Sequence, residues 1–141
     1  MKRATCPLAI LLALLGGMSG GCSTPRERAL VQEQVAQFHA LLDAGRAGEI
    51  YDSASPAFRE GGQKSEAMAY FDGIRRNLGT VQKSEVDTWQ VYNMTNGKFL
   101  ALTYNTQYSG GEASEYFMYR MTKGNPLLVR YNISSNALVT K

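Results

Sequence analysis

The pattern of hydrophobic and polar residues divides this chain into three parts. Residues 8–15 form a short, unbroken apolar run. From residue 24 to residue 79, apolar residues recur every three or four positions, which is the spacing of one helix face. From residue 80 onward, apolar and polar residues alternate, as they do in half-buried strands. The pattern predicts a short leader, a helical half and a strand half.

The helical half is predicted to contain three helices. Thr24-Pro25-Arg26-Glu27 has the spacing of a capping box with proline in the first turn, so the first helix should begin there and end at Gly45. A second helix is expected over residues 47–54, before Pro56. Residues 56–64 are expected to form a loop anchored by Phe58, and a third helix capped by Ser65 should end at Gly79. The apolar faces of the first and third helices consist of Val31, Val35, Phe38 and Leu42, and of Ala67, Tyr70, Phe71, Ile74 and Leu78.

Three turn signals divide the strand half. Asn96-Gly97, residues 109–111 and residues 123–126 favour tight turns between strands at about 80–92, 98–108, 113–122 and 127–138. Turns this short join neighbouring strands, so an antiparallel meander is expected. The faces predicted to meet the helices carry Leu100, Leu102 and Tyr104 on the second strand, and Leu127, Val129, Tyr131 and Ile133 on the fourth.

Some strands are apolar on both faces. Phe117 and Tyr119 alternate with Tyr116 and Met118, and Phe99 lies opposite Leu100 in the alternation. A sheet covered by helices on one side should have one polar face, so the second apolar face indicates a partner. Phe99, Tyr116 and Met118 are the predicted interface residues, and the partner would be a second copy or another envelope protein.

The first 22 residues read as an export signal. Lys2 and Arg3 precede the apolar run, which is too short to span a bilayer, and small residues lead to Cys22. The segment resembles a bacterial lipoprotein signal, which implies a signal peptide at 1–21, a lipid on Cys22, a linker at 22–25 and a single domain at 26–141. Ordinary signal cleavage is the alternative, because Ser19 stands where such signals usually have leucine. Ser23 in place of aspartate favours the outer membrane, with the domain in the periplasm.

The composition of the chain argues against several classes of function. Without Lys2 and Arg3 the chain has 13 basic and 12 acidic residues, and it lacks a basic cluster with interleaved aromatics, so nucleic-acid binding is not expected. Cys6 lies in the leader and Cys22 would carry lipid, which leaves no thiol for a disulfide. A single histidine excludes a three-histidine zinc site. No metal and no cofactor are expected.

Two groups of residues are candidates for a pocket. His39 and Asp43 are spaced four apart, so the carboxylate could orient the imidazole as a base; the alternative is a partly exposed helix pair. Tyr104, Tyr108, Tyr119, Tyr131 and Trp89 could line a pocket for an apolar ligand. The alternative for these aromatics is that they supply core volume.

The arrangement resembles the nuclear transport factor two-like superfamily of cone-shaped α+β domains, and within it small exported bacterial proteins with a domain of unknown function. The matching segments are 41–45, 55–59, 74–79 and 131–133. The resemblance implies three helices packed on a curved four-stranded antiparallel meander. Enzymes of this superfamily place an Asp, His or Tyr inside the cone. We therefore expect a lipid-anchored extracytoplasmic binding or protein-interaction module, with a small-molecule enzyme or an accessory subunit of an envelope assembly as alternatives.

Overall fold

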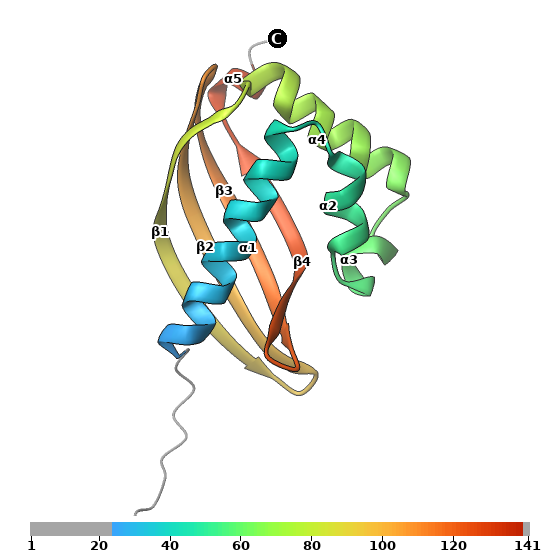
Figure 1. Ribbon diagram of the computed structural model, residues 1–141, viewed down its shortest axis with the longest axis vertical. Helices are drawn as coiled ribbons and strands as arrows, with labels where there is room; N and C mark the ends of the chain where they lie inside the picture. The colour runs from blue at the N-terminus through green and yellow to red at the C-terminus, as the bar shows by residue number, and fades with distance from the viewer. Residues whose placement is uncertain (1–23, 140–141) are drawn as a thin grey trace, which may run out of the picture.

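The computed structural model describes residues 24–139, and it has the predicted α+β fold. Four helices precede the sheet: α1 (Pro25–Asp43), α2 (Ala47–Ser53), α3 (Pro56–Glu60) and α4 (Lys64–Leu78). The strands β1 (Val81–Met94), β2 (Gly97–Tyr108), β3 (Gly111–Thr122) and β4 (Asn125–Ser134) form one antiparallel sheet in chain order, and α5 (Asn136–Val139) follows (Figure 1). The predicted signal peptide and Cys22 lie outside the described residues.

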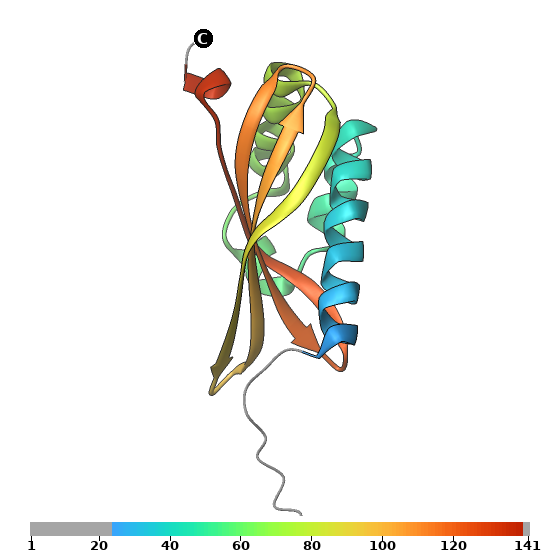
Figure 2. The ribbon, with the colours of Figure 1, turned by 90° about the vertical axis from the view of Figure 1, so that its left-hand side faces the viewer.

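The helices pack on one face of a strongly twisted sheet. Figure 2 shows α1 running along that face, while the other face of the sheet is not covered by α1 to α4. Irregular pairing between Val86 and Thr88 on β1, and between Met118 and Tyr119 on β3, adds to the twist. The predicted curved meander under N-terminal helices is confirmed.

The start of α1 is fixed as the sequence predicts. The Thr24 hydroxyl accepts a hydrogen bond from the Glu27 backbone N–H at 3.2 Å, and the Glu27 carboxylate accepts one from the Thr24 N–H at 2.8 Å. The same carboxylate lies 2.7 Å from Lys98 Nζ on β2. The first turn of α1 is therefore held both by its own cap and by the sheet.

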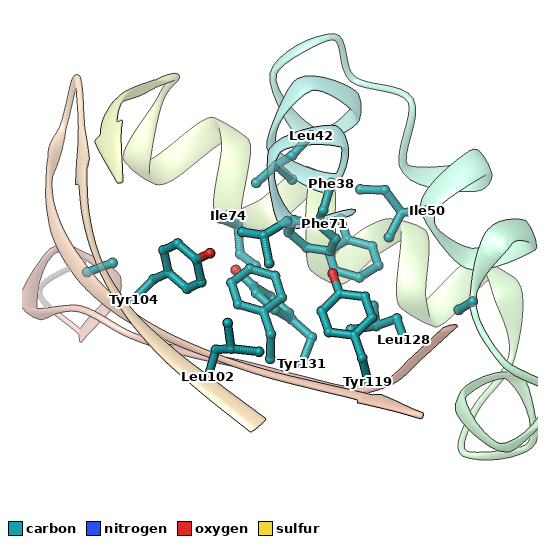
Figure 3. Packing of buried hydrophobic residues seen from close by; sticks show 14 of the residues in the cluster. Phe38, Leu42, Ile50, Phe71, Ile74, Leu102, Tyr104, Tyr119, Leu128 and Tyr131 are labelled. Atoms are coloured by element: carbon teal, nitrogen blue, oxygen red, sulfur yellow. The ribbon is translucent and has the colours of Figure 1, made fainter. Parts of the chain in front are cut away.

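The core lies between the helices and the inward face of the sheet and is rich in aromatic rings (Figure 3). The rings of Phe38 and Phe117 meet edge to face with centroids 5.1 Å apart, and Phe38 and Tyr131 are 4.6 Å apart. The largest apolar side chains that are almost fully buried are Val31, Val35, Leu42, Ile50, Phe71, Leu78, Leu100, Leu102, Tyr108 and Phe117.

Two boundaries in the helical half differ from the prediction. The expected loop after Ser55 contains α3, because the Ser55 hydroxyl caps the Phe58 N–H at 3.2 Å and Pro56 suits a first helical turn. Helix α4 begins at Lys64, not after Ser65, since the Glu66 carboxylate accepts a hydrogen bond from the Gln63 N–H at 3.1 Å. Both helices thus begin at local caps.

The last strand also differs. Met118 pairs with Arg130 and Tyr119 pairs with Leu128, so the bulge shifts the inward face of β4 by one residue. Leu128 is buried at 6% exposure, whereas the predicted core residues Leu127 and Val129 are only partly buried. Strand β4 ends at Ser134, and the remainder of the expected strand forms α5.

Candidate functional site

A single carboxylate lies at the centre of the core. Glu115 on β3 is 0% exposed. Its Oε2 lies 2.8 Å from His39 Nε2 and 2.5 Å from Thr106 Oγ1, and its Oε1 lies 2.7 Å from the Tyr108 hydroxyl and 2.6 Å from the Tyr131 hydroxyl. Both carboxylate oxygens are therefore fully used by protein groups. This network replaces the water that the charge loses on burial.

Electrostatics keep this carboxylate ionised. Burial acts to raise the pKa of Glu115, but the hydrogen bonds from His39, Thr106 and Tyr131 and the charge of His39 together lower it below the usual value of 4.5. Burial and the Glu115 charge raise the pKa of Tyr108 and Tyr131, so both phenols stay neutral. The two phenols and Thr106 therefore donate, and Glu115 accepts.

His39 is brought to Glu115 by the packing of α1 across the sheet. The histidine is 7% exposed, so the expected partly exposed helix pair is wrong. The suggested orientation of His39 by Asp43 is also wrong, because the imidazole bonds to Glu115. Asp43 instead accepts a hydrogen bond from the Val81 N–H at 3.1 Å, which ties the end of α1 to the start of β1.

A recess of about 280 Å³ opens at the seam between α1 and β1, next to this network. Its lining consists of Gln32, Val35, Ala36, His39, Ser84, Val86 and Tyr104. Ser84 connects it to the buried carboxylate, since Ser84 Oγ lies 2.9 Å from Thr106 Oγ1. The rings of His39 and Tyr104 meet edge to face with centroids 6.5 Å apart.

The structure brings together only some of the predicted pocket residues. His39 and Tyr104 share the recess, and Tyr131 bonds to Glu115 beneath it. Tyr119 is 2% exposed and stacks with Phe117 in the core, beside a separate small gap of about 20 Å³. Trp89 packs at the margin of the core.

Trp89 lies near the start of α1. The Arg28 guanidinium lies 5.3 Å from the centre of its ring. Trp89 pairs with Leu102 on β2, whereas Tyr104 pairs with Val86 further along the same two strands. Trp89 is therefore not part of the recess around His39.

The predicted interface residues share the sheet face that the helices leave uncovered. Phe99, Met118 and Tyr116 alternate with the core residues Leu100 and Phe117. Phe99 is only 6% exposed on this face, and the Arg120 guanidinium lies 6.0 Å from its ring centre. Met118 and Tyr116 are partly exposed. Their role as an interface stays a prediction.

Sequence reasoning did not single out Glu115 or Thr106, and it predicted Tyr108 as a pocket residue, whereas Tyr108 donates to Glu115 in the core. The signal that could have found Glu115 is the alternation of β3: Ala113, Phe117 and Tyr119 occupy the inward face, and Glu115 occupies the same face between them. A carboxylate in an otherwise apolar row must find donors. Its partners come from α1, β2 and β4, so spacing along the chain does not identify them.

Two further features of residues 24–139 concern metal ions and membrane-spanning helices. No group of three or more His, Cys, Asp or Glu side chains in this range is placed to hold a metal ion. No helix within it is both long and apolar enough to cross a membrane.

Comparison with known proteins gives a family without an assigned activity. Residues 34–129 match the family described as protein of unknown function DUF4019. The chain belongs to this family. No curated protein matches it. The fold is similar to the solved structure of Aln2 from a Streptomyces species, with a TM-score of 0.52 and 13% identity over 83% of this chain and 96% of Aln2. This likeness supports the cone-like α+β fold of the DUF4019 domain.

Proposed function

We propose that this DUF4019 protein is a lipid-anchored, extracytoplasmic interaction module that associates with a second copy through the uncovered face of its sheet. The observation that carries the proposal is the row of Phe99, Met118 and Tyr116 on a face that no helix of residues 25–78 covers. A two-fold contact would use this patch twice and remove the partly exposed Tyr116 and Met118 from water.

Charge on the same sheet favours self-association. Arg130 on β4 pairs with Met118 on β3, so it stands next to the patch. Arg120 lies at the other end of the patch, over Phe99. The opposite edge of the sheet carries the exposed Asp87 on β1, next to an ion pair in which Lys83 Nζ lies 3.0 Å from Glu85. A two-fold arrangement would bring Arg130 of one copy toward Asp87 of the other.

The filled core argues against an enzyme that works deep inside the cone. Glu115 would be the natural acid or base there, but four protein donors occupy its oxygens. A substrate could reach it only by displacing one of these groups. The buried carboxylate of Glu115 therefore supports a role in stabilising the fold better than a role in catalysis.

Sedimentation equilibrium of the detergent-extracted full chain tests the interaction. The wild-type protein should be a dimer at micromolar concentration. The double variant Tyr116→Lys, Met118→Lys should be a monomer whose unfolding midpoint no longer depends on protein concentration. Asn105→Lys, on the polar end of the same face, is the matched control and should remain dimeric. A wild-type monomer at every concentration would contradict the proposed interface.

The anchor is tested separately. The Cys22→Ala chain should leave the membrane fraction or accumulate as a precursor, whereas the wild-type chain should carry a lipid mass on its N-terminal cysteine. An unlipidated wild-type protein cleaved elsewhere would contradict the anchor without affecting the proposed interface.

A further inference from the structure

The recess between α1 and β1 combines apolar walls with buried polar groups. Val35 and Val86 form part of the walls, and Val86 is 36% exposed at the surface. The His39 side chain is 9% exposed and Tyr104 is 5% exposed, so two polar side chains more than nine-tenths buried line the same hollow. Small-molecule sites typically combine an apolar lining with a few convergent polar groups.

The hydroxyl of Tyr104 is not used by the protein. None of residues 24–139 forms a hydrogen bond with it, although every fully buried side-chain nitrogen or oxygen in that range has a partner. The hydroxyl must therefore be accessible, and Tyr104 borders the recess. Figure 3 shows the ring projecting from β2 with its hydroxyl directed away from the strand. Tyr104 thus lines the recess and carries a hydroxyl that has no hydrogen-bond partner among residues 24–139.

Hydrogen-bond directions determine what the other polar groups can offer. An ionised carboxylate only accepts, so Thr106 must donate its single hydroxyl hydrogen to Glu115. Ser84 must then donate to Thr106 Oγ1, which leaves Ser84 Oγ with lone pairs for the recess. His39 likewise directs Nε2 toward Glu115, so Nδ1 is the ring nitrogen that has no bond to the carboxylate.

We propose that this recess binds a small molecule with an apolar body and a hydroxyl or amine head group that donates to Ser84 Oγ, beside the His39 ring. Ser84 Oγ has only lone pairs left for the recess, so it favours a ligand that donates and disfavours a carboxylate. The volume of about 280 Å³ limits the ligand to a size below that of most drug-like molecules. This site is separate from the proposed interface, since Phe99, Met118 and Tyr116 are on the other sheet face.

The single histidine of the chain makes the test direct, because histidine-selective ¹³C labelling of the full chain gives one imidazole signal set. Cyclopentanol, cyclopentylamine and cyclopentanecarboxylate would be titrated separately into the detergent-solubilised protein. The alcohol or the amine should shift the His39 signals saturably, and the carboxylate should not. Which of the two binds more tightly identifies the head group.

Matched serine variants test the assigned acceptor. Ser84→Ala should weaken binding about fivefold, the effect of one ordinary hydrogen bond. Ser114→Ala, at an exposed position on β3, should leave binding unchanged. Val86→Phe should abolish the shifts by filling the recess from its exposed rim, and it provides the test if Ser84→Ala does not fold. The proposal is overturned if neither donor ligand gives a saturable shift, if the carboxylate binds as well, or if filling the recess has no effect.

Discussion

The Oε2 atom of Glu115 and the Nε2 atom of His39 lie 2.8 Å apart, although the two residues are 76 positions apart in the chain. This bond connects α1 to the middle of the sheet through the core. Because the carboxylate is 0% exposed, every donor around it contributes to the stability of the folded state and to its unique packing.

Replacement of Glu115 by glutamine should strongly destabilise the domain. The amide has one oxygen and directs N–H groups toward Tyr108 or Tyr131, which now donate to the carboxylate. We expect a loss of about 3 kcal/mol or more, as for other broken buried charge networks. Urea unfolding measures this, with Glu112→Gln at an exposed position of the same strand as the control, expected within about 0.5 kcal/mol of wild type. Equal stability of the two variants would show that the network is unimportant.

The difference between wild type and Glu115→Gln should depend on pH. The pKa of Glu115 is lowered in the folded state, so its contribution is fully present above the usual value of 4.5 and is lost as pH falls through the folded value. The free-energy gap between the two proteins should therefore be constant near neutral pH and should narrow in acid below about pH 4.5. A gap that widens on acidification would mean that folding raises this pKa.

The tyrosine hydroxyls in the core should differ sharply in how much each contributes to the free energy of unfolding. Tyr131→Phe and Tyr108→Phe each remove a bond to the ionised Glu115 and should cost about 1.5–3 kcal/mol. Tyr104→Phe and Tyr119→Phe remove hydroxyls that form no hydrogen bond within residues 24–139, so they should change stability by less than about 0.5 kcal/mol. Thermal unfolding of the four variants gives the comparison. A uniform loss across the set would contradict the assigned bonds.

The C-terminal end of α4 should not tolerate a side chain. Gly79 has φ of +78°, and an added Cβ would lie 2.0 Å from Ser109 Oγ. Gly79→Ala should therefore destabilise the domain by about 1–3 kcal/mol. Gly73, within the same helix, is the control: its added Cβ has no atom closer than 4.0 Å, so Gly73→Ala should stabilise by about 0.5–1 kcal/mol. Changes of the same sign would contradict the roles assigned to the two glycines.

Local signals predicted the architecture better than the site. The capping box at Thr24 and the turn at Asn96-Gly97 depend on neighbouring residues, and they mark true element ends. The alternation along β4 did not predict that Leu128 lies on the inward face. This position depends on the bulge opposite Met118 and Tyr119, and a bulge arises from the pairing of two strands, which alternation in one strand does not reveal. The partner of His39 was missed for a similar reason. Asp43 is close in sequence, whereas Glu115 is brought close only by packing α1 across the sheet.

The capping box at Thr24 also limits how far the domain could stand from a membrane. Only Ser23 and Thr24 separate Cys22 from the first residue of α1, and an extended residue spans at most about 3.6 Å. A lipid on Cys22 would therefore hold the domain within about 10 Å of the headgroups. The β1–β2 and β3–β4 turns lie at the same end of the molecule as the start of α1 (Figures 1 and 2), so both would face the bilayer. Copies anchored this closely would share one orientation relative to the membrane. Lateral diffusion in two dimensions would then determine how often their sheets meet.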